Sequence, residues 1–112
     1  MVQYQAELDR AFSAISDPTR RAILERLGRG SATISELAAP ADMSLTGLKK
    51  HVRALEEAEL VMTEKRGRTR HCRLGPKRLD DAAEWIDAYR RTWEERLDRL
   101  EELIERRKES PR

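Results

Sequence analysis

The last third of the chain carries a helical pattern of apolar residues that is long for a domain of this size. Over residues 76–108, apolar side chains recur at steps of three and four, which places them on one face of a helix. Such a face must be covered, either by the rest of the chain or by the same helix of a second copy. We favour the second copy, because one short N-terminal helix is the only other element free to cover it. The stripe comprises Leu79, Ala82, Ile86, Tyr89, Trp93, Leu97, Leu100 and Ile104, with Trp85 beside it.

Size and composition also leave room for a partner. The chain has 112 residues, of which 38% are apolar and 39% charged. This length predicts a single domain over residues 1–112, and a domain of this size buries only roughly 65% of the surface that its unfolded chain exposes. Such a modest core favours a second chain that would cover part of the remaining apolar surface.

Three features predict a cytoplasmic protein without a membrane segment. The single Cys72 cannot form an internal disulfide, and a lone cysteine fits a reducing compartment. The N-terminus, MVQYQAELDR, lacks the basic-then-apolar layout of a signal peptide. No apolar run approaches the roughly 18 residues that would suggest a membrane span.

Two short helices are predicted before Gly30. The first ends at the segment SDPTRR, where Asp17 is suited to cap the second helix. Pro18 then takes the first helical position, where its missing N–H does no harm. The apolar residues of the first helix are Tyr4, Leu8, Phe12 and Ile15, and those of the second are Ala22, Ile23 and Leu27.

A helix-turn-helix is predicted over residues 33–58. Its first helix begins near Thr33 or Ser35 and is closed by Pro40. Ser44 is placed to cap its second helix, which is the fourth helix of the chain. The expected buried residues are Ile34, Leu37 and Ala38 in the first of these helices, and Leu48, Val52 and Leu55 in the second.

The fourth helix carries its charges in an order that the helix macrodipole disfavours. Its cations lie in the first half and its acids in the second, although anions are favoured near a helix N-terminus. At about 100° per residue, Thr46, Lys50 and Arg53 point away from the apolar stripe, and Lys49 flanks them. A partner that attracts these cations would explain the arrangement. The acids are Glu56, Glu57 and Glu59.

A basic β-hairpin is predicted over residues 60–74, because β-branched and apolar residues flank the turn signal Arg66-Gly67-Arg68. Its tip carries no acid between residues 65 and 73. A tip of this kind repels itself unless an anion lies against it; the alternative is an edge ribbon that charge keeps soluble. The cations are Lys65, Arg66, Arg68, Arg70 and Arg73.

The positive excess of the chain is confined to this middle region. Residues 44–74 carry eight Lys and Arg against four Asp and Glu, whereas the segments on either side are each slightly acidic. A local basic patch is typical of nucleic-acid binding, and the alternative is a solvated basic surface.

Two helices, a helix-turn-helix, a basic hairpin and a long helix together predict a winged helix-turn-helix, mainly α with a small β-hairpin. A helix-turn-helix places its second helix in the major groove of DNA. The basic half of the fourth helix would then meet DNA. The attraction to DNA would outweigh the unfavourable interaction with the helix dipole, which is about 0.3–1 kcal/mol per exposed charge. Gly47 fits the same interpretation, since a residue without Cβ lets the helix backbone approach closely.

Three segments, ISDPTRRAILERL, ISELAAPADMSLTGLKKHVRALEEAELV and GRTRHCRL, resemble the ArsR/SmtB family of bacterial transcriptional regulators of the non-metal-sensing type. The similarity covers about residues 8 to 100. It implies a homodimer, built from the first and last helices, that binds a palindromic, inverted-repeat DNA operator and represses transcription. The implied dimer interface comprises Tyr4, Leu8, Phe12, Trp85, Tyr89, Trp93, Leu97 and Leu100, within a dimerisation helix at 76–108.

The resemblance also implies which residues bind DNA. Most of the recognition helix lies between Ser44 and Arg53, and the tip of the wing, which spans 60–74, lies between Arg66 and Arg70. The implied DNA-binding residues are Ser44, Thr46, Gly47, Lys49, Lys50, His51, Arg53, Arg66, Arg68 and Arg70.

The chain departs from the family in three ways. Lys49 stands where the family often has Ser, which adds charge. Glu59 stands where Gly is usual, and a left-handed residue without Gly costs about 1 kcal/mol. The family's metal sensors carry Cys pairs in the third helix or Asp and His ligands in the last, and this chain has neither set. We therefore expect no metal site and no cofactor.

The remaining reactive groups leave several interpretations open. His51 either packs or donates to a phosphate, and Arg20 and Arg21 either touch phosphate or pair with an acid. His71 and Cys72 are neighbours on a strand and point to opposite faces, a poor start for a zinc site. Cys72 is more readily a small buried residue than a redox switch. No catalytic motif is present, so an enzyme is not expected.

Three functions follow from the sequence. The first is a dimeric DNA-binding repressor without a metal. The second is a sensor of the same fold that responds to an unknown small molecule or to redox change. The third is a protein-interaction dimer that has lost DNA binding, and the basic recognition face argues against it.

Overall fold

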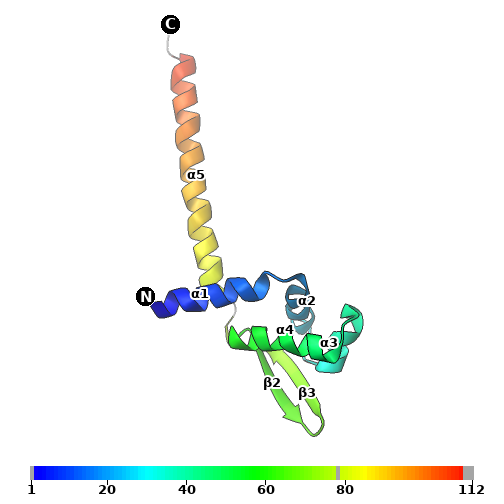
Figure 1. Ribbon diagram of the computed structural model, residues 1–112. Helices are drawn as coiled ribbons and strands as arrows, with labels where there is room; N and C mark the ends of the chain where they lie inside the picture. The colour runs from blue at the N-terminus through cyan, green and yellow to red at the C-terminus, as the bar shows by residue number, and fades with distance from the viewer. Residues whose placement is uncertain (1, 78, 110–112) are drawn as a thin grey trace. The chain divides into compact units, whose positions relative to one another are not determined.

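The computed structural model describes residues 2–77 and 79–109 (Figure 1). The chain forms two compact units that divide after Asp80. The predicted order of four helices, a hairpin and a long last helix is confirmed, with one short strand added. The elements are α1 (Val2–Ile15), α2 (Pro18–Leu27), β1 (Ala32–Thr33), α3 (Ile34–Ala41), α4 (Leu45–Glu57), β2 (Val61–Arg66), β3 (Thr69–Leu74) and α5 (Asp80–Glu109).

Side-chain caps begin three of the helices, and the two at Asp17 and Ser44 confirm the predictions. Asp17 accepts hydrogen bonds from the backbone N–H groups of Thr19 and Arg20 at 2.8 and 3.1 Å, and Pro18 opens α2. Ser44 accepts from the N–H of Gly47 at the start of α4. At α3, Thr33 and Glu36 form a reciprocal capping box.

The hydrophobic core of the first unit lies under α4. The predicted stripe of α4 is confirmed, since Leu48, Val52 and Leu55 are all buried. They pack with buried residues of the other elements of this unit, namely Ala14, Ile23, Leu27, Ala32, Ile34, Leu37, Ala38, Leu60, Val61 and Cys72. The core thus fixes one face of α4 and leaves the opposite face to solvent.

The sheet contains one strand that the sequence did not predict. The strand order is β1-β3-β2, with every pair antiparallel, and Ala32 and Thr33 of β1 lie opposite Cys72 and His71 of β3. Two residues carry no period-two pattern, so only their pairing with a distant strand defines them. This pairing joins the start of the helix-turn-helix to the hairpin.

Two further expectations were wrong in detail, and Ala22, unlike Ile23 and Leu27 of the same helix, is exposed. Pro40 lies inside α3, which ends one residue later and is followed by Asp42 in a left-handed conformation with φ of 50°. The last helix begins at Asp80 rather than Pro76. Leu79 precedes it with φ of 63° and packs against the core of the first unit, so Leu79 is not part of the helical stripe.

The turn after α4 keeps the geometry that favours glycine, although Glu59 occupies it. Glu59 has φ of 61°. Its N–H donates to the carbonyl of Glu56 at 2.9 Å, and the N–H of Leu60 donates to the carbonyl of Leu55 at 3.0 Å. This pair of bonds is a Schellman motif with Glu59 at the left-handed position. The turn is therefore of the kind that the family's glycine would form.

The second unit is the helix α5. Along it, Trp85 stacks on Tyr89 with ring centroids 5.5 Å apart, and Tyr89 meets Trp93 edge-on at 6.3 Å. Among the described residues, no helix combines the length and apolar character that crossing a bilayer requires.

Candidate nucleic-acid interface

The solvent face of α4 presents the polar side chains that the helical spacing predicted. Thr46, Lys50 and Arg53 are exposed on the side opposite the buried stripe, and Lys49 is exposed beside them. In Figure 1 the β2–β3 hairpin projects from the helical body beside α4. The basic helix and the basic hairpin therefore belong to one region of the first unit.

A groove runs between α4 and the hairpin, and we call it the helix–wing groove. One hollow of about 480 Å³ lies along α4, and a second of about 380 Å³ lies toward the hairpin tip. The two hollows share Ile34, Lys49 and Arg70 and so lie next to each other, and the name covers both. The other lining residues are Thr46, Lys50, Val52, Arg53 and Glu56 in the first, and Ser35, Leu45, Lys65, Arg68 and Thr69 in the second.

The lining of the helix–wing groove is strongly basic. Its only acid is Glu56, whereas six of its residues are cations. Cations that converge on a concave surface concentrate positive potential there, which suits a polyanion such as a phosphodiester backbone. The six cations are Lys49, Lys50, Arg53, Lys65, Arg68 and Arg70.

The register of the hairpin separates its cations onto two faces. Lys65 lies opposite Arg70, and Thr63 lies opposite the buried Cys72, so these four residues share the face that continues from the core. Arg66 lies on the other face, where its Nε is 3.4 Å from the carboxylate of Glu64. Lys65 was expected among the basic residues of the hairpin but not among the implied DNA-binding residues. Counting in steps of two from the expected buried Cys72, across the two-residue turn, places it on the same face as Arg70.

A hydrogen-bonded chain of three side chains links the hairpin to α4. Arg70 Nη1 donates to Thr63 Oγ1 at 2.8 Å, and Thr63 Oγ1 donates to Glu56 Oε2 at 2.8 Å. Sequence reasoning did not assign this role to Thr63 or Glu56, because the contact depends on strand register and on the distance between elements. It gives one of the acids at the end of α4 a structural function.

The chain is similar to known transcriptional regulators over most of its length. A helix-turn-helix domain family model matches residues 15–64. The HTH-type transcriptional regulator Rv2034 of Mycobacterium tuberculosis is 35% identical over 97 residues, which are 87% of this chain and 88% of that protein. The transcriptional repressor SdpR of Bacillus subtilis is 32% identical over 79 residues, 70% of this chain and 88% of that protein.

Solved structures agree with these relatives. The crystal structure of the ArsR family transcriptional regulator RHA00566 is 42% identical, with a TM-score of 0.76 over 84% of this chain and 97% of that one. This chain belongs to the ArsR family of transcriptional regulators. The homodimeric winged helix-turn-helix domain Mb0332 of Mycobacterium bovis, solved by NMR, shares the fold at 21% identity, with a TM-score of 0.64 over 88% of each chain.

ArsR-family membership makes the chain a winged helix-turn-helix transcriptional regulator, and the relatives named above are regulators rather than enzymes. Within a winged helix-turn-helix, α4 corresponds in position to the recognition helix and the β2–β3 hairpin to the wing. Gly47 has a reason to be glycine within the fold as well, because a Cβ there would lie 3.2 Å from both Met43 Cγ and Ser44 Oγ.

His51 of the recognition helix is held by the end of α1 and the start of α2. It is partly buried, and its Nδ1 lies 3.2 Å from Arg20 Nη1 and 3.8 Å from Asp17 Oδ2. An arginine only donates, so this ring nitrogen accepts. Partial burial raises the pKa of Asp17, but the backbone N–H donors of Arg20 and Thr19 and the positive charge of Arg20 outweigh it, and the pKa is lowered.

The two arginines that open α2 close the end of α1. Arg20 donates from Nε to the carbonyl of Ala14 at 2.7 Å and from Nη2 to that of Ser13 at 2.9 Å. Arg21 donates to the carbonyl of Ile15 at 2.7 Å. The last carbonyls of a helix have no partner within it, so these guanidinium groups act as a C-terminal cap that neither sequence alternative anticipated.

Cys72 and His71 lie on opposite faces of β3, as expected. Cys72 is fully buried, and burial first, then the charge of Glu56, raises the pKa of its thiol to about 11. A thiol in this state is a poor nucleophile and a poor metal ligand. Within residues 2–77 and 79–109, no three His, Cys, Asp or Glu side chains are grouped so that they could hold a metal ion.

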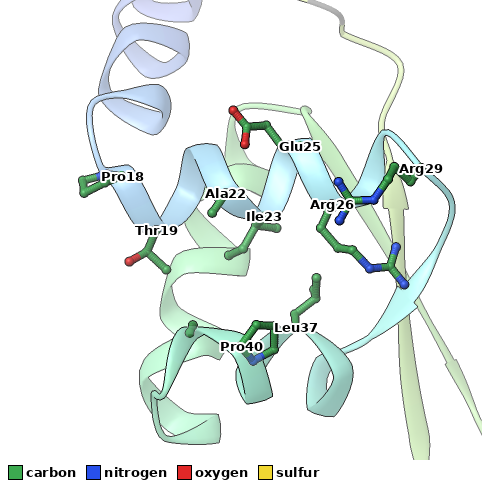
Figure 2. A pocket seen from close by; sticks show the side chains of 10 residues that line it. Pro18, Thr19, Ala22, Ile23, Glu25, Arg26, Arg29, Leu37 and Pro40 are labelled. Atoms are coloured by element: carbon green, nitrogen blue, oxygen red, sulfur yellow. The ribbon is translucent and has the colours of Figure 1, made fainter.

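A further hollow of about 450 Å³ lies between α2 and α3 (Figure 2). Ile23 and Leu37 approach each other across it, Arg26 lies at one end, and Glu25 points away. Arg26 already donates to the carbonyl of Gly30 at 3.0 Å. None of the six cations of the helix–wing groove lines this hollow, so it is separate from the candidate nucleic-acid interface.

The residues predicted at the dimer interface differ in exposure. On α1, Leu8 is buried, Phe12 is partly buried and Tyr4 is 42% exposed. Five predicted residues lie on α5, and each is about half exposed, from 47% at Trp85 to 54% at Leu97. Tyr89, Trp93 and Leu100 fall between these two values.

Proposed function

We propose that this protein is a homodimeric, sequence-specific repressor that binds an inverted-repeat operator through the helix–wing groove, without a metal or cofactor. The observation that carries the proposal is the convergence of six cations from the recognition helix and the wing on one groove with a single acid. Recognition helices of this type enter the major groove, and phosphate contacts from flanking cations fix their position.

The cations and polar residues divide into two roles. Thr46 and Lys50 lie on the outward face of α4, where side chains reach base edges, so they are proposed to read sequence. Arg68 and Arg70 of the wing, with Lys65, are proposed to bind phosphates. Ser44, Gly47, Lys49 and Arg53 complete the surface, while His51 supports the recognition helix through Arg20 and Asp17.

Dimerisation is supported by the apolar stripe of α5. Its large apolar side chains are about half exposed, and a stripe of this length is unfavourable in water unless a partner covers it. Mb0332, which shares the fold, is homodimeric, and SdpR is a repressor. We propose that α1 and α5 of two copies form the dimer, as the family resemblance implies.

Selection of DNA from a random duplex library tests the proposal. Sequencing of the fragments that the purified protein retains should show two inverted half-sites whose centres are about 10 base pairs apart or a multiple of that distance. Enrichment of a single, unpaired half-site would contradict the dimeric arrangement. The absence of any enriched sequence would contradict sequence-specific binding.

A further inference from the structure

We propose that Thr63 is a positioning residue for DNA binding, which together with Glu56 holds Arg70 in its phosphate-binding orientation before DNA arrives. The proposal rests on the proposed function, because it concerns how the helix–wing groove is prepared for its ligand. It assigns a role to two residues that carry no positive charge and that lie between the recognition helix and the wing.

The strand register explains why Arg70 reaches Thr63. Thr63 lies directly opposite Cys72, so Arg70, two residues before Cys72 on β3, is its diagonal neighbour on the same face. Diagonal neighbours are about 7–8 Å apart at their backbones, a distance that a long side chain spans. Arg70 therefore runs back along the hairpin toward α4, where it lines both hollows of the groove, rather than outward at the tip.

The two hydrogen bonds that join Arg70, Thr63 and Glu56 can run in one direction only, from the arginine through the hydroxyl to the carboxylate. A threonine hydroxyl has one proton, and Thr63 gives it to Glu56 Oε2 at 2.8 Å. The lone pairs of the hydroxyl are then left for Arg70 Nη1, which donates at 2.8 Å. A guanidinium has five N–H groups, so Arg70 retains four for phosphate oxygens. Glu56 thus orients the hydroxyl, and the hydroxyl orients the arginine.

A held arginine binds more tightly than a mobile one, because its rotamer freedom is lost on folding and not on association. The ordering of one long side chain at an interface weakens association by a factor of about 2 to 12. Removal of the Thr63 hydroxyl should therefore weaken DNA binding through Arg70, although the Thr63 side chain need not touch DNA.

The test compares Thr63→Val, which keeps the shape of the side chain, with Thr63→Ser, which keeps the hydroxyl. Affinity for the duplex selected above is measured by fluorescence anisotropy, alone and combined with Arg70→Gln. Thr63→Val frees the Arg70 of both subunits and should weaken binding at least about fivefold. Thr63→Ser should stay within twofold of wild type, and Thr63→Val should have no further effect beside Arg70→Gln. Thermal unfolding of each variant shows whether the fold is retained.

A second readout requires no DNA. The Nε–H resonance of Arg70 should report an ordered side chain in the wild type and in Thr63→Ser, and a mobile one in Thr63→Val. Wild-type affinity in Thr63→Val, or an equal loss from Thr63→Val with and without Arg70→Gln, would overturn the inference while leaving the proposed function intact. Failure of the wild-type protein to bind any duplex would overturn both.

Discussion

Replacement of Glu59 by glycine should stabilise the protein without changing how it binds DNA. Glu59 is held at φ of 61° by the Schellman motif that ends the recognition helix. This left-handed conformation costs a residue with a Cβ roughly 1–2 kcal/mol of conformational free energy, whereas it is unstrained for glycine. Both hydrogen bonds of the motif come from the backbone, so glycine keeps them.

The expected gain is smaller than the strain alone. Glycine also raises the conformational entropy of the unfolded chain, which costs about 0.4–1 kcal/mol. At the centre of these two ranges the net stabilisation is about 0.8 kcal/mol, equivalent to a rise in Tm of about 2–6 °C for a domain of this size. The position and exposure of the α4 side chains should not change, so operator affinity should stay within about twofold of wild type.

Glu57→Gly is a matched control, because Glu57 is also exposed and is the last residue of α4. It removes the same charge from a residue within the helix, where glycine costs about 0.5–1 kcal/mol, so Tm should fall. Thermal unfolding at one fixed protein concentration compares the two, since the Tm of a dimer depends on concentration. Equal changes in Tm for both variants would refute the argument from left-handed strain.

Three other predictions follow from the same structure. Trp93→Ala should cost about 3–5 kcal/mol if Trp93 is buried in a dimer, and sedimentation should then show dissociation; a wild-type protein that is monomeric at micromolar concentration would contradict this. Zinc, cadmium and arsenite should leave operator affinity unchanged, whereas a tenfold change, about 1.4 kcal/mol of coupling, would reveal a site at Cys72 and His71. The stability of the fold should decline as pH rises from about 9 to 11, because the Cys72 thiol ionises near its ordinary pKa of 9.0 when unfolded but only near 11 when folded. Denaturant titrations should show a smaller decline in Cys72→Ala over the same range, and parallel declines in the two proteins would contradict the assignment.

Features encoded within a few residues could be predicted from the sequence. The caps formed by Asp17 and Ser44 are local hydrogen bonds, and the stripe of α4 needs only a period of 3.6 residues. The basic face of the recognition helix followed from the same period. These signals were enough for the order of the elements and for the part of the interface that α4 contributes.

Features that depend on distant parts of the chain could not be predicted. The two residues of β1 become a strand only by pairing with β3. Leu79 continues the apolar spacing of α5, but its φ of 63° ends that pattern, and spacing carries no information about a backbone angle. The contact of Arg70 with Thr63 and Glu56 required both the strand register and the distance from the hairpin to α4.

The salt dependence of operator binding in single-site variants tests the central claim most directly. Arg68→Ala should weaken binding to all duplexes and make the log–log salt slope shallower by ~0.9 for each phosphate that the variant no longer neutralises. Lys50→Ala should instead reduce the preference for operator by about 1–3 kcal/mol if its side chain reaches a base. Arg29→Ala, an exposed cation beside the hollow between α2 and α3, is the control and should change neither quantity. If the double change of Lys50 and Arg68 leaves affinity and salt slope as in the wild type, the helix–wing groove is not the DNA-binding surface.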